Sequence, residues 1–192
     1  ICSGTKDSES PRLLQYDPES SLVNKLPSQK KDLIVRRQKA YDLIKSLYNS
    51  GTALRTSPYN EDVVFGQDLG GTKDGRYLPA IQEYIGRFYN EGGLGSEGLK
   101  KMISSGHHVL ILSGLYGFLC PDELIQLYEC PLEDLPEFQQ FWSRDDAITE
   151  VLVEYIRMMG IRNVIDLTAQ QEYRNLVDWS AVREEDGVRV FH

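Results

Sequence analysis

Four segments of the chain carry apolar residues at the spacing of an amphipathic helix, in which every third or fourth side chain faces the core. They are residues 32–48, 78–89, 96–104 and 146–159. The last segment has the longest apolar stripe. The pattern therefore predicts four helices, of which the last is the best defined.

Polar residues near these segments indicate where the helices begin and end. Ser143 and Asp146 resemble an N-terminal capping box, and Gly160 supplies a C-terminal stop for the last helix. Three cationic residues of the first helix lie off its apolar face: Arg36, Arg37 and Lys39.

Short apolar and β-branched runs separate the helical segments, at residues 1–3, 62–65, 109–112, 163–167 and 188–191. The run 109–112 is continuously apolar, which is typical of a strand covered on both faces, and we expect 163–167 to be another buried strand. Strands that alternate with helices favour parallel pairing. We therefore predict an α/β fold, with a mainly parallel mixed sheet flanked by helices. It forms one domain over residues 1–192, with long loops at 7–31 and 66–76.

Composition and charge narrow the class of protein. The chain has 192 residues, enough for one domain with a sizeable core. It has no apolar run near the roughly 20 residues of a membrane helix, and no signal-peptide pattern, so we expect a cytoplasmic protein with no membrane partner. The net charge of −8 removes the overall attraction to phosphates on which nonspecific nucleic-acid binding depends.

Candidate chemistry gathers at the predicted carboxyl ends of three strands, which in an open α/β sheet lie along one edge. The loops carry a cation at Lys6 and a carboxylate at Glu172, which we expect to be catalytic together with Tyr116. Small and polar residues beside them are expected to bind the ligand: Ser3, Gly4, Ser113, Gly114, Gly117, Tyr128, Gln171 and Tyr173. The alternative is structural, since tight turns need the same residue types.

Other candidates are weaker. Arg87 lies off the apolar face of its predicted helix and is suited to clamp a phosphate or carboxylate, unless it is simply solvated. The adjacent His107 and His108 would point to opposite faces of a strand and cannot easily share a metal. The three cysteines have no metal-binding or disulfide spacing, so the sequence predicts neither a metal nor a cofactor.

Several of these motifs resemble the YaaA peroxide-stress family (DUF328, UPF0246). The run Leu-Ser-Gly-Leu-Tyr-Gly at residues 112–117 and the run Pro-Asp-Glu-Leu-Ile-Gln-Leu-Tyr at residues 121–128 are similar to its signature. Gln-Phe-Trp at 140–142 and the loop at 166–173 are similar to further family elements in the same order. Residues 1–6 are a fainter counterpart of its N-terminal element, and residues 7–75 show no clear match.

The resemblance implies protection from hydrogen peroxide, lower free iron, and DNA binding. Three positions depart from the family pattern, because Cys120 and Glu129 stand where it has arginines and Asp166 stands where it has asparagine. The lost arginines and the acidic total argue against duplex binding.

The expected function is therefore that of an enzyme acting on a nucleobase, nucleoside or nucleotide, with glycosidic-bond cleavage as one possible reaction. The alternative is a DNA-binding stress protein without catalysis. A third reading, iron sequestration, lacks a cluster of ligands at metal-binding spacing.

Overall fold

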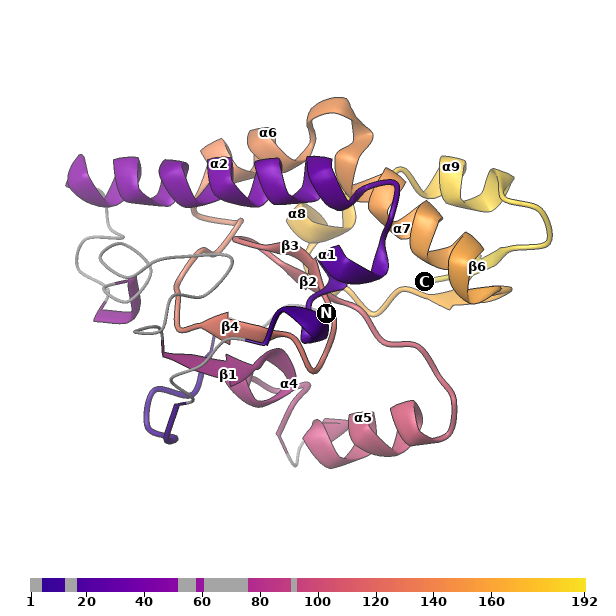
Figure 1. Cartoon of the computed structure of the whole chain (residues 1–192), viewed down its shortest axis with the longest axis horizontal. Helices are drawn as coiled ribbons and strands as arrows, with labels where there is room; N and C mark the ends of the chain where they lie inside the picture. The colour runs from indigo at the N-terminus through magenta and orange to yellow at the C-terminus, as the bar shows by residue number, and fades with distance from the viewer. Residues whose placement is uncertain (1–4, 13–16, 52–57, 61–75, 91–92) are drawn as a thin grey trace.

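The computed structural model describes residues 5–12, 17–51, 58–60, 76–90 and 93–192. The predicted strands at 1–3 and 62–65, the loop at 66–75, and the candidates Cys2, Ser3 and Gly4 lie outside these ranges. Figure 1 shows the long helix α2 along one side of the molecule, with β2 and β3 beneath it and β1 and β4 on the opposite side. The pair β5–β6 lies at one end with α7 and α9.

The helices match the apolar periodicity in three of the four predicted segments. The described helices are α1 (Leu22–Lys25), α2 (Lys30–Asn49), α4 (Ala80–Glu83), α5 (Gly95–Ser104), α6 (Pro136–Trp142), α7 (Ala147–Met159), α8 (Gln171–Arg174) and α9 (Trp179–Glu184). Short 3-10 turns are η1 (Pro18–Ser20), η3 (Pro58–Asn60) and η4 (Arg144–Asp146). The predictions for 32–48, 96–104 and 146–159 are therefore confirmed by α2, α5 and α7.

The prediction of a mainly parallel sheet is wrong. The described strands form three two-stranded sheets, of which β1 (Tyr77–Pro79) with β4 (Leu124–Gln126) and β2 (Ile111–Ser113) with β3 (Gly117–Leu119) are antiparallel. β5 (Asn163–Ile165) and β6 (Arg189–Phe191) are parallel. The reason is the connection: β2 and β3 are separated by three residues, whereas a parallel pair needs a crossover of a dozen or more.

The predicted helix over residues 78–89 is also wrong beyond its first turn. It ends at Glu83, and Tyr84 forms an antiparallel bridge with Lys6. The Asp7 amide donates to the Glu83 carbonyl (2.9 Å), and the Ile85 amide donates to the Thr5 carbonyl (3.1 Å). Tertiary pairing with the N-terminal segment thus replaces the helical hydrogen bonds.

Four smaller expectations also fail. Residues 7–31 are not one long loop, because they contain η1 and α1. The β5 strand is not buried, since Ile165 is 65% exposed. Asp146, the residue before α7, forms no side-chain cap, although Gly160 ends the helix at φ 64° as predicted. Arg37 does not face solvent, because it is 2% exposed.

Arg37 attaches α2 to the β2–β3 hairpin. Its guanidinium donates to the Tyr116 carbonyl (3.0 Å) and the Phe118 carbonyl (2.7 Å), and it pairs with Glu123 (2.5 Å). Glu123 also accepts from the Ser21 hydroxyl (2.7 Å) and from two backbone amides. These bonds fix α1 and α2 over the turn that carries the family signature.

No helix in the described ranges has the length and apolar character that crossing a membrane requires.

Candidate functional site

Lys6 lies inside the molecule, among tyrosine rings. It is 6% exposed, and its Nζ lies 4.4 Å from the centroid of the Tyr128 ring and 5.8 Å from that of the Tyr84 ring. A cation over the face of an aromatic ring is attracted by the ring quadrupole, more strongly where water is excluded. The backbone bridge between Lys6 and Tyr84 sets this position.

A chain of hydroxyl groups lies beside Lys6. The Tyr84 and Tyr128 hydroxyl oxygens are 2.5 Å apart, and the Ser113 Oγ lies 2.7 Å from the Tyr128 oxygen. Ser113 comes from the end of β2, and Tyr128 comes from just beyond β4. We call these four residues, Lys6, Tyr84, Tyr128 and Ser113, the lysine–tyrosine cluster.

The direction of the Ser113 proton follows from counting donors. Ser113 Oγ accepts from the amides of Leu115 (3.1 Å) and Tyr116 (3.0 Å), which occupies both of its lone pairs. Ser113 therefore donates its proton to Tyr128, and the Tyr128 and Tyr84 hydroxyls share the next hydrogen bond. The chain of hydroxyl groups thus runs from Ser113 through Tyr128 to Tyr84, beside Lys6.

A buried ion pair adjoins the cluster. Glu83, next to Tyr84 in the chain, is fully buried and pairs with Arg12 at 2.7 Å. Burial raises the pKa of the Glu83 carboxyl above its usual value, although Arg12 and Lys6 act to lower it. The region around Lys6 therefore combines two cations and one carboxylate away from solvent.

The signature loop between β2 and β3 is packed tightly. The Trp142 Nε1 donates to the Gly114 carbonyl at 2.7 Å, and Gly117 adopts φ 70°. Tyr116 is 3% exposed, and its ring packs edge-on against Tyr128 at 5.4 Å between centroids. Burial raises the pKa of Tyr116 well above its ordinary value, which keeps the hydroxyl protonated. Of the predicted site residues, Lys6, Ser113, Tyr116 and Tyr128 are thus brought together.

The third predicted loop lies around α8. Gln171 is exposed, and Glu172 is half-buried with no side-chain hydrogen bond or ion pair to another described residue. Tyr173 is buried, and its hydroxyl accepts from the Leu132 amide at 3.4 Å. Within the described part of the chain, no hydrogen bond or ring contact joins these residues to the lysine–tyrosine cluster.

A polar network lies at the end of β5, just before this loop. Asp166 accepts from Arg174 Nε (2.8 Å) and from the amide (2.8 Å) and hydroxyl of Thr168. Its carboxylate also lies 3.0 Å from the Nδ1 of His192. Burial acts to raise the pKa of Asp166, but the bonds from Thr168 and His192 and the charge of Arg174 together lower it. This network holds the start of the loop in place.

The remaining candidates lie apart from the lysine–tyrosine cluster. Arg87 is exposed in the turn after α4. His108 Nδ1 lies 3.1 Å from the Tyr155 hydroxyl, and the described residues contain no group of metal-binding side chains. Cys120 is buried, and burial raises the pKa of its thiol to about 11, which disfavours the nucleophilic thiolate.

Sequence patterns did not reveal the two buried ion pairs. Arg12 and Arg37 occupy segments rich in charge, where a buried arginine looks the same as a solvated one. The predicted helix 78–89 includes Glu83 and Tyr84, so the sequence does not indicate that Tyr84 pairs with Lys6. The available signal was Pro79 and Gly86 on either side of a short segment, a combination that limits helix length.

Comparison with known proteins identifies a family and a similar relative. The chain matches the family described as "Peroxide stress protein YaaA" over residues 3–191, a range that includes the segment 7–75. It is 30% identical over 125 residues to a UPF0246 protein of Porphyromonas gingivalis, an alignment that covers 61% of this chain and 46% of that relative. The chain thus spans less than half the length of that relative. No solved structure matches.

Proposed function

Because the chain belongs to the family of peroxide stress protein YaaA, we propose a function within that setting: an enzyme that acts on a nucleobase, nucleoside or nucleotide at the lysine–tyrosine cluster. The observation that carries the proposal is the buried chain of hydroxyl groups from Ser113 through Tyr128 to Tyr84, which lies beside the cation of Lys6. The family relationship supports a role in the peroxide response.

The chemistry of the cluster fits this substrate class. Cleavage of a glycosidic bond needs an acid that protonates the leaving group and a carboxylate that activates water or attacks the sugar. The tyrosine hydroxyls of the cluster are our candidates for the proton donor, and the Lys6 ammonium supplies charge for an anionic group. Glu172 remains our candidate for the carboxylate.

Access to the cluster requires movement. Lys6 is 6% exposed, so a ligand reaches it only when the segment around it opens. Two backbone hydrogen bonds, from Asp7 to Glu83 and from Ile85 to Thr5, join the segment around Lys6 to the segment around Tyr84. Opening this segment would break these bonds locally and would not require global unfolding.

A ligand-binding experiment tests the proposal. We expect adenine or adenosine to raise the melting temperature of the wild-type chain, since a ligand that binds the native state stabilises it by mass action. Lys6→Met should abolish the shift, whereas Lys100→Met, which removes an exposed lysine paired with Glu97, should retain it. A shift of equal size in both variants, or none in wild type at millimolar ligand, contradicts the proposal.

Turnover separates catalysis from binding. Glu172→Gln should leave the ligand-induced shift intact and abolish release of the base from the nucleoside, measured by chromatography. Retained turnover in this variant removes Glu172 from the mechanism. The binding site is then tested by Lys6→Met alone.

The second candidate function is DNA binding in the peroxide response, which the family relationship favours. The net charge of −8 opposes it. The two candidate functions predict different behaviour, because DNA affinity would fall steeply as the salt concentration rises.

A further inference from the structure

A groove beside α2 belongs to none of the sites above. It has a volume of about 360 Å³ and lies between α2 and the connection from α6 to α7. Its lining contains three cations and an apolar surface: Arg36, Lys39, Arg144, Val35 and Phe141. Asp32 and Asp145 complete it. Pockets for small ligands begin at about 300 Å³, so the groove is large enough for one.

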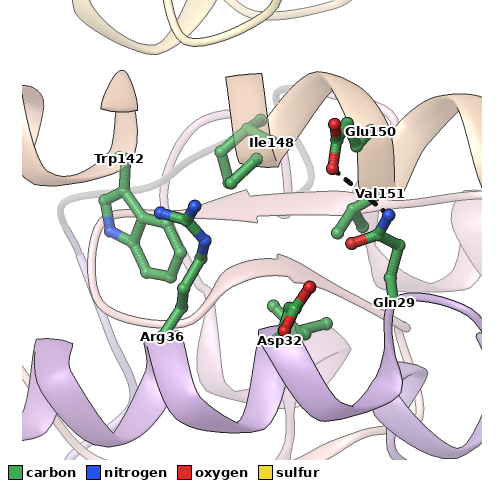
Figure 2. A pocket seen from close by; sticks show the side chains of 9 residues that line it. Gln29, Asp32, Arg36, Trp142, Ile148, Glu150 and Val151 are labelled. Atoms are coloured by element: carbon green, nitrogen blue, oxygen red, sulfur yellow. Dashed lines mark hydrogen bonds between the residues drawn. The ribbon is translucent and has the colours of Figure 1, made fainter. Parts of the chain in front are cut away.

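A smaller cavity adjoins the groove and shares Asp32 and Arg36 with it. Its volume of about 20 Å³ holds no more than a water molecule. Figure 2 shows its walls, with Arg36 reaching from α2 toward Trp142 and a hydrogen bond between Gln29 and Glu150 (3.2 Å) across the other end. The groove, and not this cavity, is therefore the candidate for a ligand.

Both walls of the groove are held by buried neighbours of its lining residues. Arg37, next to Arg36, binds two carbonyls of the β2–β3 hairpin and Glu123. Trp142, next to Phe141, is fully buried and donates to the Gly114 carbonyl. A site with fixed walls loses less conformational freedom when a ligand binds.

Arg36 is the most adaptable cation of the groove. Its Nη2 donates to Asp145 at 3.2 Å, and its Nη1 donates to the Arg144 carbonyl at 3.4 Å. The Asp145 side chain is 79% exposed, and exposed pairs of this kind contribute little to stability. A guanidinium binds a phosphate or carboxylate with two parallel bonds, an arrangement that the single bond to Asp145 does not use.

The backbone that presents Asp145 is unusual. Asp145 and Asp146 have φ values of 58° and 50°, two successive non-glycine residues in the left-handed region. This conformation directs the Asp145 carboxylate across the groove to Arg36. Strained residues of this kind occur frequently at ligand-binding sites.

We propose that the groove binds a phosphate monoester with an aromatic body, and that Asp145 competes with this ligand for Arg36. The phosphate would take Arg36, supported by Lys39 and Arg144, and the aromatic body would lie on Phe141 and Val35. The site is independent of the lysine–tyrosine cluster, because the two share no residue.

Phenyl phosphate is the probe that tests the proposal, titrated by calorimetry against the intact chain. We expect Arg36→Met to weaken its affinity about tenfold or more. Asp145→Asn should strengthen binding severalfold, because it removes the competing charge while asparagine still tolerates positive φ. Inorganic phosphate should bind more weakly than phenyl phosphate, and phenol should not bind measurably.

The controls separate this site from the lysine–tyrosine cluster. Lys6→Met should leave phenyl phosphate affinity unchanged, and Arg36→Met should leave the nucleoside-induced melting shift unchanged. An unaltered melting temperature in Arg36→Met shows that the variant is folded. The proposal is overturned if phenyl phosphate does not bind at millimolar concentration, or if its affinity is the same in wild type, Arg36→Met and Asp145→Asn.

Discussion

At the scale of single residues, the neighbours Arg36 and Arg37 differ completely in environment. Arg37 is 2% exposed and forms four side-chain bonds, whereas Arg36 lies at the surface and pairs with an exposed aspartate. A buried charge without its partner costs several times more than a broken surface pair. The two residues therefore make a matched comparison on one helix.

We predict that Arg37→Met lowers the free energy of unfolding by about 3–5 kcal/mol, because it leaves Glu123 buried without its cation. Arg36→Met should change it by about 1 kcal/mol or less. Urea denaturation of both variants measures the difference. Equal midpoints in the two variants would contradict the structural role of Arg37.

A second prediction at this scale concerns pH. The pKa of Asp166 is lowered from its ordinary value of 3.8, so its bonds stabilise the fold above that pH and are lost as pH falls through the lower, folded value. The wild type should therefore lose more stability than Asp166→Asn between about pH 5 and pH 2. Asp134→Asn, which alters an exposed carboxylate, should retain the wild-type slope. Parallel slopes in wild type and Asp166→Asn contradict the assignment.

At the scale of elements, apolar periodicity predicted where helices lie along the chain, but not how strands pair. Helices α2 and α7 were predictable because each buries a face of several residues, whereas α5 follows the apolar spacing although only Leu99 is buried in it. Strand pairing was not predictable, since a run such as 109–112 is equally apolar in a parallel sheet and in a hairpin. The bridge between Lys6 and Tyr84 joins residues far apart in sequence, so no local sequence pattern predicts it.

The same limit applies to the candidate site. The signature residues Ser113 and Tyr128, with Lys6, were predictable as polar groups at strand ends, and the structure places them in one cluster. Tyr84 was predicted only as a core residue, because its hydroxyl partner is contributed by another strand. Residue type thus identified members of the cluster, and tertiary pairing determined its composition.

A prediction at the element scale concerns the packing of the β2–β3 hairpin. A Cβ at Gly114 would lie 2.0 Å from the Cys130 carbonyl oxygen, a backbone atom that cannot move aside cheaply. Gly114→Ala should therefore destabilise the chain by about 1–3 kcal/mol or more. Gly98→Ala in α5 is the control, since its Cβ would meet only the flexible Leu94 side chain and alanine favours the helix by about 0.5–1 kcal/mol. Thermal melts compare the two, and a neutral Gly114→Ala would contradict the packing.

At the scale of the whole molecule, charge decides between the two candidate functions. The chain has 21 Lys and Arg against 29 Asp and Glu. Among the described residues, seven of these cations pair with carboxylates of the chain itself, Arg12, Arg37, Arg157 and Arg174 among them. Cations already paired within the protein release few counterions from DNA.

We therefore predict no gel shift with single-stranded, duplex or bubbled DNA at about 10 μM protein and about 50 mM salt, where basic proteins bind nonspecifically. Binding that weakens steeply with salt would favour the DNA-binding candidate instead. In that case Lys39→Met and Arg144→Met locate the contact, because both residues lie in the one groove where cations outnumber carboxylates among the described cavities. If each variant reduces the salt slope by about one, the groove is the DNA site. If neither does, the positive surface lies elsewhere, and the aromatic phosphate proposal for the groove is unaffected.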